Sequence, residues 1–299
     1  MSKFYLPNLN LEYHLCRWTK KIDGSAVALA IFLLFNYRKS MIKFNCNKWK
    51  GKGDEMKDKK IRTGFVLLSD EGFNIKEFKR NLYRDWEIMI KEEEQSDILI
   101  FEVSDIKVVC ALINSPVPNK EAEGNAMNNY LWKEGEEETA KHKAHIVVSV
   151  TKGENPIGNS IVFTMVVSSL LKLKNAIGIY QYPTVLPSDF YIRCAEDLKE
   201  KVLPVLNWIY IGIYPSEKGF SAYTCGMDYF DKDEIEVINS KTTPSELYGF
   251  IYDIVSYVLE YNAVLNDGET IGFSEKEKLP ITKSKGIAVE GNSIKIKYK

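Results

Sequence analysis

Short apolar runs alternate with segments of helical periodicity downstream of Met56, and this alternation restricts the fold more than any other feature of the sequence. Apolar runs of this length, bounded by turn residues, are typical of buried strands. Helical patterns lie between the first run and the second and between the third and the fourth. The order β-α-β-β-α-β predicts an α+β protein whose first half has the ferredoxin-like arrangement. The four runs span 61–70, 97–103, 106–113 and 144–150.

Local signals indicate where several elements begin and end. Ser104-Asp105 lies between the second and third runs and predicts a tight turn, so these runs are expected to pair as a hairpin. Asn155-Pro156 places a capping residue before a proline at the first helical position, which predicts a helix start. The sequence TPSE at 243–246 adds a capping box to the same arrangement and predicts another.

The second half of the chain predicts another α+β lobe with an antiparallel or mixed sheet. Strand patterns recur at 207–214, 220–226 and 234–239, between the helical segments. We therefore expect three parts, with the second lobe packed tightly on the first. They are a basic extension over 1–55, a ferredoxin-like lobe over 56–152 and the second lobe over 153–299.

Residues 1–55 differ from the rest of the chain in charge, since they hold ten Lys/Arg and four Asp/Glu, whereas the whole chain holds 40 and 41. Their apolar run, Ala26 to Phe35, is shorter than the roughly 20 residues that a helix needs to span a bilayer. GKGDEM at 51–56 can be back-translated into a purine-rich run ahead of an ATG codon. We therefore expect Met56 to be the true start and 1–55 to be a poorly ordered upstream read-through. The alternative is a genuine basic extension.

Charge and cysteine content narrow the expected surroundings and partners. The formal net charge of −1 gives no reason to expect nucleic acid or an anionic membrane as a partner. The number of cysteines, five, is odd, and no two are spaced as a C-x-x-C pair. This usage is typical of a reducing compartment, so we expect a cytoplasmic protein with a possible protein partner. The cysteines are at positions 16, 46, 110, 194 and 225.

The segment GENPIGNS, residues 153–160, follows one predicted strand and precedes a helix, as a phosphate-binding loop does. Asn159 stands where such a loop carries lysine, and Pro156 removes a backbone donor that a phosphate would need. The helix start at Asn155 explains the same residues without a ligand. The sequence therefore predicts no nucleotide and no other cofactor.

Two of the three histidines, His142 and His145, lie three residues apart at a predicted helix-to-strand junction. In an extended segment this spacing places the two side chains on opposite faces. No cysteine or acid completes a metal ligand set at a recognisable spacing. We therefore expect the pair to lie at a solvated junction and predict no metal site.

Carboxylates and aromatic residues cluster in AYTCGMDYFDKDEIEV, residues 222–237. Alternation along a strand places Cys225 on the same apolar side as Tyr223, so a packed thiol is expected there rather than a nucleophile. The stretch lacks the glycine and the final glutamate of a calcium loop. We therefore predict no catalytic residue and a set of binding residues where two strands end. This set is Tyr223, Met227, Asp228, Phe230, Asp231, Glu234 and Glu236.

The same stretch, together with DGETIGFSEKEKLPI (267–281) and AHIVVSV (144–150), resembles a bacterial family catalogued as domain of unknown function 4261. The resemblance extends from Ile61 to the C-terminus. Asp231 departs from it, because the family tends to have glycine there, which implies a reshaped loop. The family brings no activity with it; the resemblance implies a cytoplasmic bacterial α+β protein and agrees with a start near Met56.

Two classes of function fit these observations. The first is a non-catalytic protein-binding module, either of the immunity type or a regulatory partner binder. It agrees with the lack of a catalytic constellation and with a high aromatic content of 17 Tyr and 14 Phe. The alternative is a small-molecule or metal-dependent enzyme, because clustered carboxylates can transfer protons or hold Mg²⁺. That enzyme would use the acidic cluster Asp228, Asp231, Asp233 and Glu234.

Overall fold

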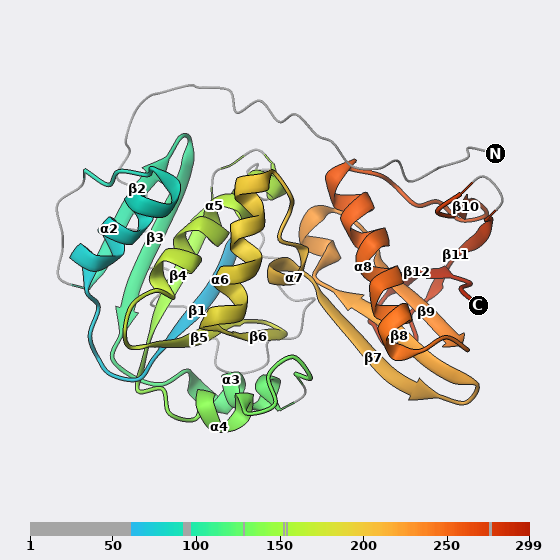
Figure 1. Ribbon diagram of the computed structural model, residues 1–299, viewed down its shortest axis with the longest axis horizontal. Helices are drawn as coiled ribbons and strands as arrows, with labels where there is room; N and C mark the ends of the chain where they lie inside the picture. Colours follow the sequence, from blue (N-terminus) through green and yellow to red (C-terminus); the bar gives the residue numbers. More distant parts are fainter. Residues whose placement is uncertain (1–60, 92–96, 128, 152, 154, 275–276) are drawn as a thin grey trace, which may run out of the picture. The chain divides into compact units, whose positions relative to one another are not determined.

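The computed structural model describes residues 61–91, 97–127, 129–151, 153, 155–274 and 277–299. The expectations for 1–55 and for a start at Met56 fall outside these residues. The described part of the chain divides into two compact units, 61–195 and 196–299. Each unit contains one six-stranded sheet (Figure 1). The predicted α+β class is confirmed.

The sheet of the first unit has the strand order β2-β3-β4-β1-β5-β6, and every neighbouring pair is antiparallel. The predicted hairpin is present, because Val103 pairs with Ile106 across the turn at Ser104-Asp105. The strands are β1 (Arg62–Leu68), β2 (Ile98–Val103), β3 (Ile106–Ile113), β4 (Ala144–Thr151), β5 (Ala176–Gln181) and β6 (Thr184–Pro187).

The ferredoxin-like topology is not confirmed. In a split βαβ unit a helix connects two parallel strands that enclose a third. Here β1 and β2 run in opposite directions, because three antiparallel pairings separate them. β3 and β4 pair directly with each other instead of enclosing β1. The elements follow one another in the predicted order, but that order does not determine which strand edges pair.

Helices cover both faces of this sheet (Figure 1). Alternate side chains of β1 point to the two faces, since Val66 and Leu68 belong to one apolar cluster and Leu67 to another. Three helices contribute to the first and larger cluster: α2 (Ile75–Trp86), α5 (Pro156–Leu170) and α6 (Ser188–Glu196). Two short helices cover the second face: α3 (Glu121–Ala126), which follows the turn η1 (Pro118–Lys120), and α4 (Gly135–Thr139). The first unit therefore has three layers.

The helix α5 belongs to the first unit, although the sequence placed it after a boundary at 152/153. Its predicted start is observed, because Asn155 Oδ1 accepts a hydrogen bond from the Ile157 backbone at 2.9 Å. The chain then continues into β5, which pairs with the edge of β1 that β4 leaves open. The compact unit consequently extends to Ala195.

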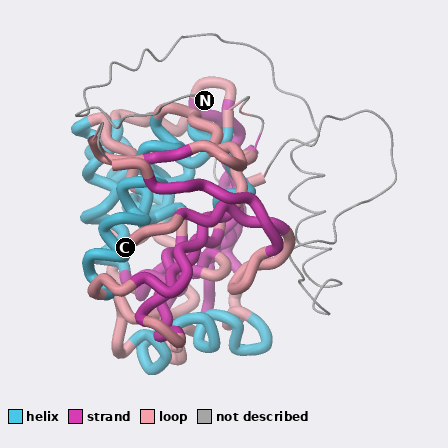
Figure 2. The backbone as a smooth tube through the Cα atoms, turned by 90° about the vertical axis from the view of Figure 1, so that its right-hand side faces the viewer, coloured by secondary structure: helices cyan, strands magenta, loops and turns pink. Residues whose placement is uncertain are grey.

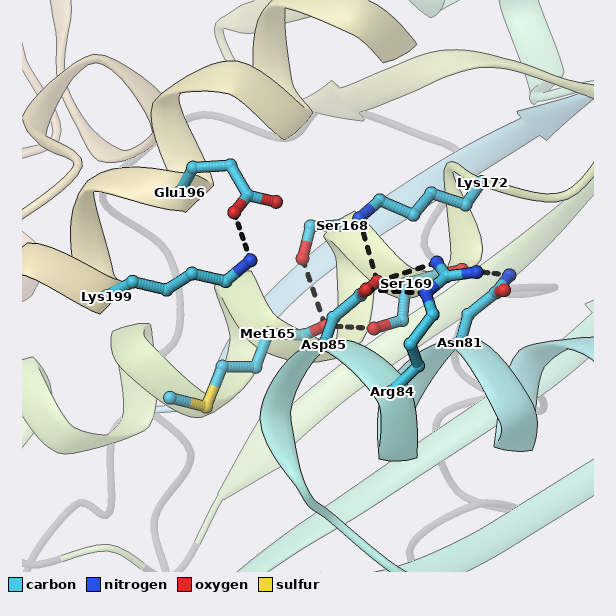
Figure 3. A network of polar contacts seen from close by, with 9 residues as sticks. All are labelled: Asn81, Arg84, Asp85, Met165, Ser168, Ser169, Lys172, Glu196 and Lys199. Carbon is cyan, nitrogen blue, oxygen red and sulfur yellow. Dashed lines mark hydrogen bonds and ion pairs between the residues drawn. The ribbon is translucent and has the colours of Figure 1, made fainter.

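Polar contacts join α2 to the α5 segment (Figure 3). Lys172 Nζ lies 2.7 Å from Asp85 Oδ2, and Asn81 Nδ2 donates to the Ser169 carbonyl oxygen at 3.3 Å. Burial alone would raise the pKa of Asp85, but hydrogen bonds from Arg84 and Lys172 hold it below its ordinary value. Asp85 therefore remains ionised and keeps the ends of the two helices together.

The sheet of the second unit has the order β10-β11-β12-β9-β8-β7 and is mixed, because β12 and β9 run parallel. Figure 2 draws its strands in magenta. They are β7 (Tyr210–Ser216), β8 (Gly219–Cys225), β9 (Glu234–Ser240), β10 (Thr270–Ile271), β11 (Leu279–Lys285) and β12 (Asn292–Ile296). The helical elements of this unit are η2 (Asp197–Glu200), α7 (Val205–Trp208), η3 (Met227–Phe230) and α8 (Pro244–Glu260).

The helix α8 begins at the predicted capping box and packs on β7 and β8. The Thr243 hydroxyl accepts from the Glu246 backbone, and the Glu246 carboxylate accepts from the Thr243 backbone. Leu247, Ile251 and Ile254 form part of its fully buried side. Throughout the residues described, no helix is both long enough and apolar enough to cross a bilayer.

Candidate functional site

The predicted binding residues surround η3, the short turn that joins β8 to β9. Gly226 precedes this turn with φ at 114°, and a Cβ atom there would lie 3.1 Å from the Trp208 carbonyl oxygen. Asp231 ends the turn with φ at 59°, in the left-handed region that glycine adopts most readily. Aspartate also tolerates this region better than most residues, so Asp231 can adopt this conformation.

Two of the predicted binding residues, Met227 and Phe230, are buried under the turn. The Phe230 ring stacks on the Trp208 indole, with 5.6 Å between the ring centroids. These side chains fix the turn to the interior of the unit, so a partner cannot reach them without unfolding the turn.

Glu234 closes the turn from the start of β9. Its carboxylate accepts hydrogen bonds from Thr224 Oγ1 at 2.6 Å and from the backbones of Gly226 and Met227 at 2.8 and 2.9 Å. Thr224 Oγ1 in turn accepts from the Ile235 backbone at 2.8 Å. Burial raises the pKa of Glu234, although these hydrogen bonds favour the ionised form. The side chain therefore acts as a brace between the ends of β8 and β9.

Glu236 is fully buried and holds the turn that connects β11 to β12. Its carboxylate accepts from the Ala288 backbone at 2.6 Å and from Ser293 Oγ at 2.5 Å. The Ile287 backbone donates at 3.0 Å, and Lys295 Nζ lies 3.3 Å away. Burial would raise the pKa of Glu236, but these hydrogen bonds lower it overall. The carboxylate thus stands ionised inside the protein as a structural group.

The three aspartates of the predicted acidic cluster lie closer to the surface. Asp233 pairs with Lys283 on β11, with 2.6 Å between Nζ and Oδ2. Asp228 and Asp231 are exposed at the two ends of η3. No group of three or more His, Cys, Asp and Glu side chains suited to a metal ion occurs within the ranges that the structure describes.

Tyr223 and Cys225 are half-buried, whereas their neighbours Ala222 and Thr224 are fully buried. Burial alternates along residues 222–225, as expected for a strand, and Cys225 is partly buried. The fully buried set includes a threonine because Thr224 is hydrogen bonded through its hydroxyl to Glu234 and Ile235.

Sequence reasoning missed two tyrosines that accompany Tyr223. Its ring lies 6.0 Å from the Tyr210 ring and 6.2 Å from the Tyr214 ring, measured between centroids. Gly212 pairs with Tyr223 in the ladder, and a Cβ atom on it would lie 2.3 Å from the Tyr223 ring. Burial raises the pKa of Tyr210 to about 12, so this phenol stays neutral over the ordinary pH range. The spacing of the two tyrosines in the sequence YIGIY of β7 was the signal from which this cluster could have been predicted.

The histidines are not at a solvated junction, so that expectation was wrong. His142 and His145 are both buried, and both contact the segment that follows β3. Backbone groups of that segment supply the polar partners that water would otherwise supply.

A comparison with known proteins found one match. No curated protein and no solved structure matches the chain. A family described as "Domain of unknown function (DUF4261)" matches residues 223–297, which include η3, Glu234, Glu236 and the β11–β12 turn. The match covers the last part of the resemblance expected from Ile61 onward. Residues 223–297 of this chain are therefore a DUF4261 domain.

Proposed function

We propose that the chain is a non-catalytic cytoplasmic protein, of the immunity type or a regulatory partner binder, and that it binds a protein through the surface around η3. The proposal rests on the observation that most carboxylates around η3 make structural contacts within the chain. Glu234 and Glu236 accept hydrogen bonds from the chain itself, and Asp233 pairs with Lys283. Carboxylates that are hydrogen bonded within the chain stabilise the fold and are poorly placed to transfer protons to or from a substrate.

The exposed part of the turn suits recognition of a basic partner. Asp228 and Asp231 present carboxylates at the surface, while the buried Met227 and Phe230 hold the turn in place. A surface that is already rigid loses little conformational entropy on binding. Two carboxylates on such a surface favour a partner with lysine or arginine side chains at the contact and increase its rate of association. The proposal includes no nucleic acid, membrane or cofactor.

Charge reversal at the turn tests the proposal. A partner is first captured from a lysate of the native source and identified, and its affinity for the purified chain is then measured. The double substitution Asp228→Lys and Asp231→Lys should weaken binding at least tenfold, or about 1.4 kcal/mol. Glu217→Lys is the matched control, because Glu217 is also an exposed acid of the second unit, at the β7–β8 turn. Equal affinities for the double variant and the control would contradict the proposal.

The electrostatics of Glu234 favour a second candidate, an enzyme that uses Asp228, Asp231, Asp233 and Glu234 on a small molecule or a metal ion. Burial, together with the nearby charge of Asp228, raises the pKa of Glu234, which is a property of general acids. Titration with Mg²⁺ or Mn²⁺ separates the two functions. A thermal stabilisation that a chelator reverses, and that Asp228→Asn removes, would favour the enzyme.

A further inference from the structure

The His142 side chain uses both ring nitrogens, and it can do so only while it is neutral. Nδ1 faces the Thr139 carbonyl oxygen, which can only accept, so Nδ1 carries the proton. Nε2 accepts a hydrogen bond from the Val117 backbone N–H at 2.8 Å. A second proton on Nε2 would place two donors against each other, because a backbone N–H cannot act as an acceptor.

His145 holds the same segment two residues earlier. Its Nδ1 lies 2.8 Å from the Ser115 carbonyl oxygen, and its ring meets the Phe65 ring edge-on. His145 pairs with Leu67 in the ladder, so it belongs to the second face of the first sheet. Burial lowers the pKa of His145 to about 4, although the contact with the Ser115 carbonyl oxygen acts in the opposite direction, and the proximity of His142 lowers it further.

The segment that the two histidines hold, residues 114–126, covers the second face of the first sheet. Val117, Ala122 and Ala126 pack there against Leu67 and Tyr180, among others. The backbone of the segment is strained, since two successive residues, Asn119 and Lys120, have φ of 56° and 54°. A left-handed conformation costs about 1 kcal/mol for a residue such as Lys120 and less for an asparagine. This strain opposes the closed position, and the histidine contacts oppose the strain.

We propose that His142 and His145 form an acid-sensitive latch. When both imidazoles are neutral they hold residues 114–126 against the sheet, and their protonation releases the segment and exposes the apolar face beneath it. Buried imidazoles that must stay neutral are a known basis for such pH-dependent two-state elements.

One charged group works against this latch. Glu123, on α3, has Oε1 3.9 Å from His142 Nδ1 and a buried Oε2 without a hydrogen-bond partner. It would stabilise an imidazolium in the closed position. His142 also lies close enough to His145 to lower its pKa, while the flanking Lys141 and Lys143 are exposed. The latch therefore opens because the backbone contact of His142 with Val117 is lost and because the buried His145 ring cannot hold a charge in the closed position, against the attraction of Glu123.

Hydrogen exchange of the full chain at pH 7.5 and pH 5.0, corrected for the intrinsic rates, tests the proposal. The displaced pKa of His145 alone predicts that the opening equilibrium of residues 114–126 rises about 30-fold between these pH values. Exchange in β4 and β1 should change much less. A change of less than twofold in 114–126 would overturn the proposal. So would an equal change throughout the first sheet, because that would report unfolding of the whole unit.

Three variants sharpen the test. His145→Gln should remove most of the pH dependence, because glutamine does not titrate. Glu123→Gln should increase the pH dependence, because the closed imidazolium loses its counter-charge. Lys141→Gln is the matched control, since it changes an exposed charge beside His142 and should leave the profile unchanged. If Glu123→Gln and Lys141→Gln behaved alike, His142 would have no part in the latch.

Discussion

Both units bury ionisable side chains against backbone groups, but they bury opposite kinds of group. In the first unit the neutral imidazoles of His142 and His145 hold residues 114–126. In the second unit the carboxylate of Glu236 holds the β11–β12 turn. An imidazole that must stay neutral fails when it gains a proton at mildly acidic pH. A carboxylate that must stay ionised fails only at lower pH, because its hydrogen bonds favour the charged form.

The difference gives the two units separate pH windows of stability. The pKa of His145 is lowered in the folded state, so stability is lost as the pH falls from about 6.5 towards 4. The pKa of Glu236 is also lowered, so its contribution persists down to the ordinary pKa of a glutamate and is lost below it. Mild acid should therefore affect the segment over the first sheet while the DUF4261 domain remains folded.

The largest effect that we expect comes from removing the buried carboxylate of Glu236. Glu236→Ala deprives several buried donors of their acceptor and leaves Lys295 without its counter-charge. Breaking a buried, hydrogen-bonded charge pair costs about 4 kcal/mol. Chemical denaturation, followed by hydrogen exchange in β9 and β12, would measure the loss. Glu217→Ala, at an exposed acid of the same unit, should change stability by less than about 0.5 kcal/mol. A loss below about 1 kcal/mol for Glu236→Ala would break the comparison.

The local parts of this arrangement were predictable from the sequence. The capping box at Thr243 and the hairpin turn at Ser104-Asp105 depend on neighbouring residues, and both are present. The donors to Glu236 are 51 to 57 residues away along the chain, so no local pattern could indicate that its carboxylate is structural. Strand order failed for the same reason, because it depends on which edges meet in space.

Burial of the histidines was missed because it depends on a segment about 25 to 30 residues earlier. The same holds for the tyrosine cluster, where Gly212 on β7 makes room for a ring on β8. Residues 222–237 were singled out by their composition. Their composition could not distinguish carboxylates that bind a partner from carboxylates that brace a turn.

A somewhat smaller effect should separate the two units by pH. Between pH 7 and pH 4 the closed position of residues 114–126 should lose about 3 kcal/mol through His145, because each pKa unit is worth about 1.4 kcal/mol. Hydrogen exchange of residues 114–126 would report the first unit, and that of β9 the second. In His145→Gln the loss in residues 114–126 should largely disappear. Parallel losses in residues 114–126 and in β9 in the native protein would show that the units do not respond separately.

Two glycine substitutions in the second unit should have opposite signs. Gly226→Ala forces a side chain to φ of 114° and towards the Trp208 carbonyl oxygen, and should destabilise by about 1 to 2 kcal/mol. Gly249→Ala lies inside α8 with no atom within 4 Å of the new Cβ, and should stabilise by up to about 1 kcal/mol. Thermal denaturation of both variants measures the difference. Destabilisation by Gly249→Ala equal to that by Gly226→Ala would show that η3 is not a specially fixed turn.

The smallest effect should come from the ion pair between Asp233 and Lys283, which is the exposed counterpart of Glu236 and Lys295 in the same sheet. Each side chain of the pair is more than a third exposed. Water screens such a pair and both side chains lose freedom on forming it, so its coupling energy should be below about 1 kcal/mol. A double-mutant cycle with Asp233→Asn and Lys283→Gln gives that energy directly, and 1 M salt should reduce it further. A coupling of about 3 kcal/mol, as large as a buried pair, would mean that depth does not separate structural from superficial carboxylates around η3. That result would also weaken the proposal that the exposed Asp228 and Asp231 bind a partner.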